Sequence, residues 1–315
     1  MTVSTIDPLV ARARPRSAWR ERLQDWLPRL VLAPSFALVL VFVYGFNLWT
    51  LLLSFTNSKA FTNLTPVGWL NYHRLWTWTF EADPPSNWYT ALVNMGLFGG
   101  LYVVFCLGLG LALAILLDQK IRGEGILRPI YLYPLALSFI VTGTAWKLFL
   151  DPRIGLEKAM HDWGWTSFHF DWVVNPRMMI YCVAIAAIWQ TSGFVMAMFL
   201  AGLRGIDGEI MKAAQIDGAS AWATYRRIVL PALRPVFLSA FIVLTHMAIK
   251  SYDLVIALTG GGPGNATELP STFMYSYTFT RNQMSVGAAS AVIMLMTIAA
   301  IIVPYLYSEL RERPQ

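Results

Sequence analysis

Charged residues are scarce in this chain. Aspartate, glutamate, lysine and arginine make up 13% of its 315 residues, and hydrophobic types make up 56%, whereas about a quarter of an average soluble domain is charged. Several apolar runs exceed the roughly 18 residues that indicate a membrane-spanning helix. The shortage of charge excludes an ordinary soluble domain and predicts an all-α, polytopic membrane protein.

Cysteine and histidine are also rare, with two and four copies. Cys106 and Cys182 both fall inside apolar segments, so we interpret them as packing residues without a disulfide or metal role. The histidines are widely scattered, and no metal-ligand cluster or nucleophilic triad stands out. We therefore predict no catalytic residue, no metal site and no cofactor bound by this chain.

A nucleotide-binding loop is missing as well. The glycine-rich stretch TGGGPGNATELP at 259–270 has neither the lysine nor the spacing of a P-loop. If ATP drives this protein, another chain hydrolyses it. The first 29 residues are polar and rich in arginine, and no small-residue cleavage site follows the first apolar run, which we therefore interpret as an uncleaved span.

Six apolar segments are long enough to cross a membrane. The predicted spans are Leu30–Leu53, Ala91–Leu117, Leu127–Leu150, Met178–Leu203, Val236–Leu258 and Val286–Tyr307. We expect a tail at 1–29, a transmembrane domain at 30–310 that contains a polar loop at 204–235, and a second tail at 311–315.

Basic residues are distributed unevenly among the predicted loops. A net charge of +6 would suggest a nucleic-acid partner in a soluble chain. Here the two tails, the second loop and the fourth loop, with the adjoining helix end, hold 16 of the 24 lysines and arginines. The other loops and their adjoining helix ends hold seven, and Lys250 is left within a span. Because cytoplasmic loops carry such an excess, we predict that both termini and the 204–235 loop are cytoplasmic, with membrane lipid and not nucleic acid around the chain.

The stretch from Glu209 to Pro235 lies between two long apolar segments and is the longest run in which polar residues interrupt the apolar ones. Its first part reads as a short amphipathic helix, with Ile210, Ala213 and Ala214 on one side and Asp217-Gly218 at its end. Small residues there would let another backbone or a large side chain approach closely. The pattern by itself indicates either a docking element or an ordinary helical loop.

A second short helix is predicted in the same stretch. Ser220 can cap it, Leu230-Pro231 ends it, and Pro235 suits the first turn of the next span. One face of this helix carries Trp222, Tyr225, Ile228 and Val229.

Ionisable residues within a span are costly and usually face a cavity or a partner. The fifth predicted span holds His246, Lys250 and Asp253 at spacings of four and three, which places them on one helical face. We expect this face, with Tyr252, to line a polar path that binds hydroxyl groups. The alternative is a Lys250–Asp253 pair that only neutralises itself against a neighbouring helix.

The fourth predicted span offers a second polar group of the same kind. Trp189, Gln190 and Ser192 combine an aromatic platform with an amide and a hydroxyl, which also suits a solute path. Packing against a neighbouring helix would explain Trp189 equally well.

Tryptophans gather in two of the predicted external loops. They are Trp69, Trp76, Trp78, Trp88, Trp163, Trp165 and Trp172. Anchoring at the headgroup level explains such residues; the alternative is that their flat faces contact a docking protein or stack on a sugar.

KAAQIDGAS followed by RRIVLPALRP resembles the EAA loop of bacterial ABC importer permeases, whose pattern is roughly EAAxxDGA, a spacer and then IxLPxxxP. The matching positions are Ala213, Ala214, Asp217, Gly218, Ala219, Ile228, Leu230, Pro231 and Pro235. Lys212 stands where that pattern has its glutamate, and Glu209 lies one turn earlier. The resemblance implies that this loop, with Glu209 and Lys212, couples the chain to ATPase subunits.

Four further stretches are similar to carbohydrate-type ABC importer permeases. They are RPIYLYPLAL, WKLFLDPRIGLEK, WQTSGFVMAMFLAGL and YDLVIALTGGGPGNATE, and LTGGGP resembles the F-type permease of the maltose importer. The resemblance implies a type I permease in the bacterial cytoplasmic (inner) membrane. Its implied partners are a second permease, two cytoplasmic ATPases that use ATP and magnesium, and a periplasmic or extracellular sugar-binding protein. The short first external loop excludes the large periplasmic insertion of the maltose protein.

Three other functions remain open from the sequence. The same architecture could import a polyol, glycerol phosphate or a peptide. A membrane-embedded enzyme would need convergent acids, bases or metal ligands beyond His246, Lys250 and Asp253. A passive channel would have no use for a docking element in the 204–235 loop.

Overall fold

The structure, a computed structural model, describes residues 18–80, 87–119 and 123–311. Within those ranges it is helical apart from one isolated bridge between Thr56 and Pro66, so the predicted all-α fold is confirmed. Most of the predicted N-terminal tail, Lys120 and Arg122 of the second loop, and residues 312–315 of the predicted C-terminal tail lie outside the described residues. The chain divides into two compact units, Met1–Thr50 and Leu51–Gln315.

The first unit is built on one long helical run. It consists of α1 (Ala18–Val39) and a π-helical turn η1 (Leu40–Gly45), and it continues into α2 (Phe46–Ser54). The part from Arg29 to Ser54 is long and apolar enough to cross a membrane, as the first predicted span required.

Three more helices of the second unit meet the same criterion of length and composition. They are α4 (Asn87–Asp118), α8 (Met179–Arg204) and the apolar part of α15 (Met284–Arg311). The second, fourth and sixth predicted spans are therefore confirmed to within a few residues of their bounds. Shorter helices join them: α3 (Leu70–Phe80), α7 (Leu156–Asp162), α9 (Gly208–Ile216), η3 (Pro263–Asn265), α14 (Pro270–Tyr275) and η4 (Ser276–Thr280).

The third predicted span, Leu127–Leu150, is wrong as a continuous helix. It consists of α5 (Glu124–Ala136) and α6 (Phe139–Leu150), which meet at an angle of 100°. Leu137 between them is extended, with φ −79° and ψ 145°, and Ser138 starts the new helix by accepting a hydrogen bond from Val141 N. Pro134 lies in the last turn of α5, where its ring blocks the usual backbone hydrogen bond and favours an early end.

The fifth predicted span, Val236–Leu258, ends earlier than the sequence indicates. Its helix α12 (Arg234–Ile249) stops before Lys250, and a separate helix α13 (Asp253–Thr259) begins three residues later. The break is stabilised from outside, because Ser271 Oγ of α14 donates a hydrogen bond to the carbonyl oxygen of Ser251. A carbonyl group released from a helix costs little when another donor reaches it.

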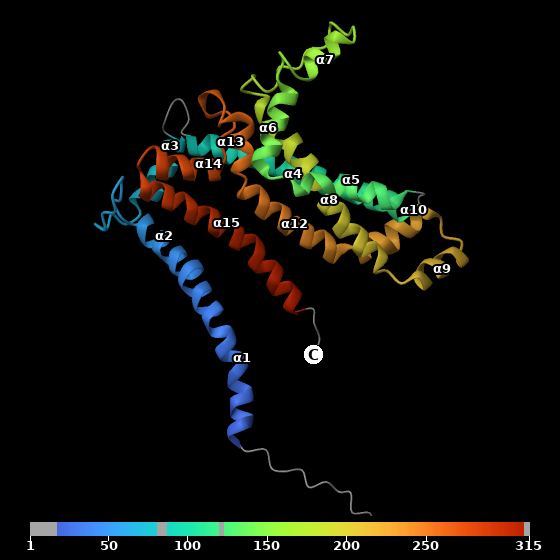
Figure 1. Cartoon of the computed structure of the whole chain (residues 1–315), viewed down its shortest axis with the longest axis horizontal. Helices are drawn as coiled ribbons and strands as arrows, with labels where there is room; N and C mark the ends of the chain where they lie inside the picture. Colours follow the sequence, from blue (N-terminus) through green and yellow to red (C-terminus); the bar gives the residue numbers. More distant parts are fainter. Residues whose placement is uncertain (1–17, 81–86, 120–122, 312–315) are drawn as a thin grey trace, which may run out of the picture. The chain divides into compact units, whose positions relative to one another are not determined.

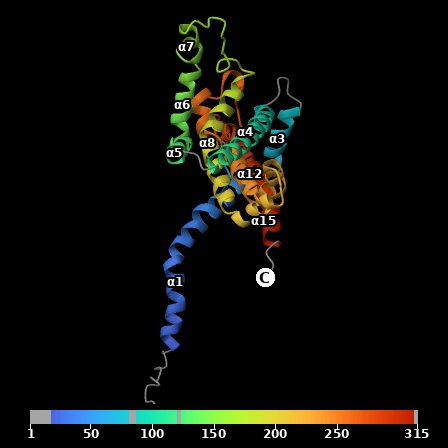
Figure 2. The ribbon, with the colours of Figure 1, turned by 90° about the vertical axis from the view of Figure 1, so that its right-hand side faces the viewer.

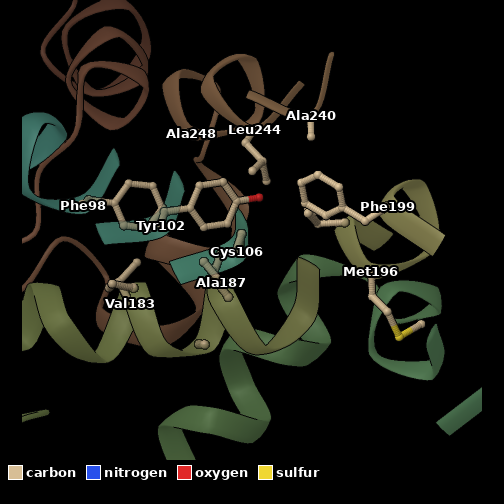
Figure 3. Close-up of a cluster of buried hydrophobic side chains, with 14 of the residues drawn as sticks. Phe98, Tyr102, Cys106, Val183, Ala187, Met196, Phe199, Ala240, Leu244 and Ala248 are labelled. Atoms are coloured by element: carbon tan, nitrogen blue, oxygen red, sulfur yellow. The ribbon is translucent and has the colours of Figure 1, made fainter. Parts of the chain in front are cut away.

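The apolar core lies where α4 packs against α8, with α12 against α4. Figure 3 shows the Phe98 and Tyr102 rings of α4, which stack 5.6 Å apart between centroids, with Val183 and Ala187 of α8 beside them and Leu244 of α12 nearby. This packing fixes the positions of the three helices that surround the site described below.

Small residues let α4 and α8 approach closely. A Cβ atom added to Gly110 would lie 2.6 Å from Val195 Cγ1 and 3.0 Å from Met196 N, closer than real Cβ atoms come to backbone or branched side chains. Cys106 and Cys182 are buried in the same core as free thiols, which fits their predicted role in packing.

A second, smaller core joins α3, the start of α4, α14, η4 and the start of α15. Trp88 is 1% exposed there, and its ring lies 4.9 Å from that of Phe273. Trp88 therefore packs inside the protein and does not present its ring at the surface, unlike Trp69, Trp163 and Trp165, which are exposed. The side chain of Trp78 lies outside the described residues.

Candidate functional sites

The break between α12 and α13 opens a cavity of about 260 Å³. Its polar lining comes from His246, Lys250, Ser251, Tyr252 and Asp253. Its apolar walls come from Phe98 and Tyr102 of α4, Phe139 of α6 and Ala187 of α8. The cavity therefore lies beside the helix core of the second unit and combines charged, hydroxyl and aromatic groups.

The predicted residues His246, Lys250 and Asp253 do line this cavity, but they do not lie on one continuous helix. We expected a continuous helical face, but α12 ends at Ile249, so the three residues come from the end of α12, the turn and the first position of α13. Within the described ranges, Lys250 and Asp253 form no ion pair with each other. The geometry therefore does not support the alternative that Lys250 and Asp253 only neutralise each other.

The turn at the break presents backbone groups as well as side chains. Lys250 N donates to His246 O at 3.2 Å and Ser251 N donates to Ala248 O at 3.1 Å, so the last turn of α12 is tightened and its other carbonyls lose their helical partners. The ring of Tyr252 lies 4.8 Å from that of Tyr275. Mixed donors and acceptors beside aromatic faces are the groups that bind a hydroxyl-rich solute.

Trp189 and Ser192 do not belong to this cavity. They line a separate, mostly apolar pocket of about 570 Å³, together with Trp146, Trp172 and Tyr181. The Trp146 and Trp189 rings pack edge to face with centroids 5.8 Å apart. His246, Lys250 and Asp253 therefore line one pocket, and Trp189 and Ser192 line another.

Gln190 has a structural role at the break between α5 and α6, which the sequence did not indicate. It is 1% exposed, and its Nε2 donates a hydrogen bond of 2.8 Å to the carbonyl oxygen of Leu137, the extended residue between α5 and α6. Gln190 thus supplies the donor that the interrupted third span needs. An isolated glutamine in an apolar helix was the only signal available in the sequence.

The predicted docking loop folds as two capped helical pieces after α8 (Figure 1). Asp207, which we did not predict, caps α9 by accepting a hydrogen bond from Glu209 N at 2.9 Å. Gly218 ends the first piece with φ +75°, a left-handed conformation that glycine adopts without strain. Ile216 is 86% exposed, although it is apolar.

The second helical piece is α10 (Ala221–Thr224), capped as predicted by Ser220, whose Oγ accepts from Ala223 N. The helix does not end at Leu230-Pro231 as predicted. It continues through the π-helical turn η2 (Tyr225–Val229) and α11 (Leu230–Ala232), because a proline that lacks an N–H group can be accommodated in a widened turn. A bend of 61° then leads directly into α12, with Pro235 in its first turn.

The two pieces are anchored at one side and open at the other. Val229 and Leu233 are 1% exposed and belong to the apolar core, whereas Trp222 is 71% exposed. Among the predicted coupling residues, Ala214 is buried, and Ala219, Leu230 and Pro231 are half-buried. The remaining ones are exposed: Glu209, Lys212, Ala213, Asp217 and Gly218.

Comparison with known proteins gives consistent matches. A family model described as "Binding-protein-dependent transport system inner membrane component" matches residues 105–312. A probable ABC transporter permease of Pyrococcus horikoshii is 41% identical over 283 residues, covering 88% of this chain and 94% of that one. The xylose/arabinose import permease of Haloferax volcanii is 34% identical over 283 residues, and the match covers 88% of this chain and 86% of that one.

The fold also matches a solved structure. A chain from a bacterial ABC transporter involved in the import of the acidic polysaccharide alginate superposes with a TM-score of 0.78. The match covers 94% of this chain and 99% of that one, at 18% sequence identity. At that identity the likeness concerns the architecture of the helices alone.

Proposed function

This chain belongs to the family of binding-protein-dependent transport system inner membrane components, and from that premise we propose that it is one permease half of an ATP-driven importer of neutral sugars. It would lie in the bacterial cytoplasmic membrane with both termini inside, as the distribution of basic residues favours. The resemblance of the 209–235 loop to an EAA loop supports the same orientation.

One observation carries this proposal: successive helical segments, joined by one bend of 61°, connect the exposed docking loop to the polar cavity. Trp222 lies near the start of α10, and the helix continues through η2 and α11 to Ala232. After the bend, α12 leads to the cavity at Lys250. Val229 and Leu233 pack these segments into the core between the two ends. A displacement of the loop by a partner would therefore move the cavity lining.

The proposed assembly contains more than this chain. A second permease would complete the translocation path, two ATPase subunits would bind the docking loops of the two permeases, and an external binding protein would deliver the sugar. ATP and magnesium would bind the ATPase subunits, since the glycine-rich stretch of this chain lacks the lysine of a P-loop.

The mechanism that follows is alternating access. ATP binding would close the ATPase pair, and the loops held by that pair would carry the movement into the spans. The cavity would then open to the binding protein and accept its sugar. Hydrolysis of ATP would restore the inward-facing state. Each step needs a mechanical connection, which the capped α9 and the α10–α11 segment, packed into the core and joined through one bend to α12, would supply.

The charge of the cavity favours a neutral solute. Lys250 and Asp253 are both part of its lining, so their charges offset each other there. A phosphorylated solute such as glycerol phosphate would be expected to meet several cations or bidentate arginines, and the lining contains one lysine. The import of pentoses by the relative from Haloferax volcanii supports the same solute class.

The experiment that tests this function measures ATP hydrolysis by the reconstituted complex, with its binding protein, across a panel of sugars. We expect one sugar, or a small group of related sugars, to stimulate hydrolysis. A complex that assembles but responds to no sugar, and does respond to a polyol or a phosphorylated solute, would contradict the proposed solute class.

Two substitutions connect that activity to the cavity. Lys250→Ala and Asp253→Ala should each lower sugar uptake at least roughly tenfold, because each removes a group that would form a charge-assisted hydrogen bond to a sugar hydroxyl. Subunit assembly, measured by copurification, should not change. Ser192→Ala in the separate apolar pocket is the control and should transport normally; equal loss in all three variants would refute the assignment of the cavity.

A further inference from the structure

The loop between α6 and α8 carries a group of side chains that the transport mechanism does not use. Glu157 and His161 lie four residues apart on α7, and His169 returns from the segment that follows. Figures 1 and 2 show α7 beyond the end of α6, away from the other helices of the second unit. The loop thus brings together two of the four histidines that are scattered along the sequence.

The three side chains are close enough to share one ion. One potential ligand atom from each lies within 4.8 Å of the other two, and the described part of the chain holds no other such group of histidine, cysteine or acidic side chains. A tetrahedral zinc site with bonds of about 2.0–2.1 Å places its ligand atoms roughly 3.4 Å apart. A small rotation closes that difference, and His169 is free to make it, since its side chain is 76% exposed.

Hydrogen bonds already orient these ligands. His161 Nε2 lies 2.7 Å from the carbonyl oxygen of Phe168; a carbonyl can only accept, so Nε2 carries the proton and Nδ1 carries the lone pair. Metal-binding histidines are commonly held in this way, by donating one ring N–H to a backbone carbonyl. Glu157 Oε2 accepts from Phe170 N at 3.2 Å, and its Oε1 lies 3.2 Å from His169 Nδ1.

The charge around the group permits a divalent cation. The nearest basic side chain on α7, Lys158, pairs with Asp162 at 3.1 Å, so its charge is offset. Two imidazoles and one carboxylate form a ligand set that zinc binds with a fourth position open to water. Harder ions such as calcium and magnesium prefer all-oxygen sites.

We propose that Glu157, His161 and His169 form a binding site for zinc or a similar divalent transition-metal ion, which fastens α7 to the segment that follows it. That segment carries rings packed in series, with Phe168–Phe170 centroids 6.4 Å apart and Phe170–Trp172 centroids 5.0 Å apart. Trp172 in turn lies against Tyr181 of α8 and lines the apolar pocket. The bound ion therefore holds the loop in a fixed orientation on α8.

The test is metal binding by the full-length chain, purified in detergent with the subunits that copurify with it and stripped with a chelator. Cobalt(II) titration should produce the visible bands of a tetrahedral site, with one ion per copy of this chain that zinc displaces. His169→Ala and Glu157→Gln should weaken zinc binding at least roughly tenfold. His73→Ala, a change at an exposed histidine of α3, is the matched control and should bind like the unaltered chain.

A second variant separates metal binding from simple hydrogen bonding. His169→Gln keeps a donor that can reach Glu157 but offers no imidazole nitrogen, so it should lose the cobalt spectrum. Amide exchange of residues 156–170 should slow on zinc addition in the unaltered chain and stay constant in His169→Gln. Equal zinc affinity in the unaltered chain and both His169 variants, or slowing of exchange on zinc addition in His169→Gln, would show that zinc binds without the His169 imidazole and would overturn the proposal.

Discussion

Glu268 carries a carboxyl group that is only 4% exposed, in the segment between α13 and α14. Its Oε2 has no hydrogen-bond partner among the described residues. Asn94 of α4 holds the backbone of the segment by donating to the carbonyl oxygens of Ala266 and Glu268, at 2.9 and 3.1 Å. The carboxyl group is thus fixed in a place where its charged form is poorly solvated.

Burial raises the pKa of Glu268 from its ordinary value of 4.5 to about 7, against a smaller opposing effect of the Arg281 guanidinium. Arg281 itself is held against Tyr277, with Nη1 3.0 Å from the phenol oxygen and the guanidinium 4.6 Å from the ring centroid. Since the folded state binds the proton more tightly than the unfolded state, the stability from this group is full below pH 4.5 and is lost as the pH rises through 7.

Glu268→Gln should remove this pH dependence. The amide is neutral at every pH, so the variant should be more stable than the unaltered complex at pH 8, by up to about 3 kcal/mol, and nearly equal to it below pH 5. The measurement is the thermal unfolding midpoint of the detergent-purified complex from pH 5 to pH 8. Parallel pH profiles for the two proteins would show that the carboxyl group ionises without cost.

The segment that contains α9 and α10 has one side packed against the core and one side exposed to solvent. Val229 and Leu233 anchor the run that begins with α10, whereas Ile216 and Trp222 leave apolar side chains exposed on a polar loop. An exposed tryptophan is typical of an anchor that fills a partner's pocket. The segment that begins with α10 leads, through the bend before α12, to the cavity, and in the proposed function a contact at the loop would act on that cavity.

Trp222→Ser and Ile216→Ser should weaken the binding of the ATPase subunits without unfolding the permease. Both side chains are exposed, so their loss removes little of the core, while a buried interface anchor is worth roughly 2 kcal/mol or more. Copurification of the ATPase subunits and sugar-stimulated ATP hydrolysis should fall together. Trp163→Ser, a change at an 81% exposed tryptophan of the α6–α8 loop, is the control; equal loss in that variant would contradict a role specific to α9–α10.

For the whole molecule, the proposed orientation places the docking loop and the α6–α8 loop on opposite sides of the membrane. Cys106 and Cys182 are 0% exposed, so the chain has no reactive surface thiol of its own in the described residues. Introduced cysteines can therefore report on each side without a cysteine-free background.

Gln215→Cys and Thr166→Cys should react with a membrane-impermeant maleimide from opposite sides. Both positions are exposed. In intact cells whose outer membrane or cell wall has been permeabilised, only Thr166→Cys should be labelled. In inverted membrane vesicles, only Gln215→Cys should be labelled. Labelling of both positions from one side would refute the proposed topology of the spans between them.

The sequence by itself determined the class of the protein, the number of apolar segments and the two short helices of the 204–235 loop. Each of these depends on local information: run length against bilayer thickness, loop charge, caps such as Ser220, and turn residues such as Gly218. The resemblance of the 209–235 loop to an EAA loop depends on residues within one short stretch, so it could also be recognised without a structure.

The tertiary structure alone decided where the spans break and which polar residues meet. The breaks at Leu137 and Lys250 depend on donors from distant parts of the chain, Gln190 and Ser271, and no local pattern reports such partners. Sequence reasoning therefore placed His246, Lys250 and Asp253 on a continuous helix and joined Trp189 to the same path. It also left His161 and His169 scattered, because their approach to Glu157 depends on a turn that no periodicity describes.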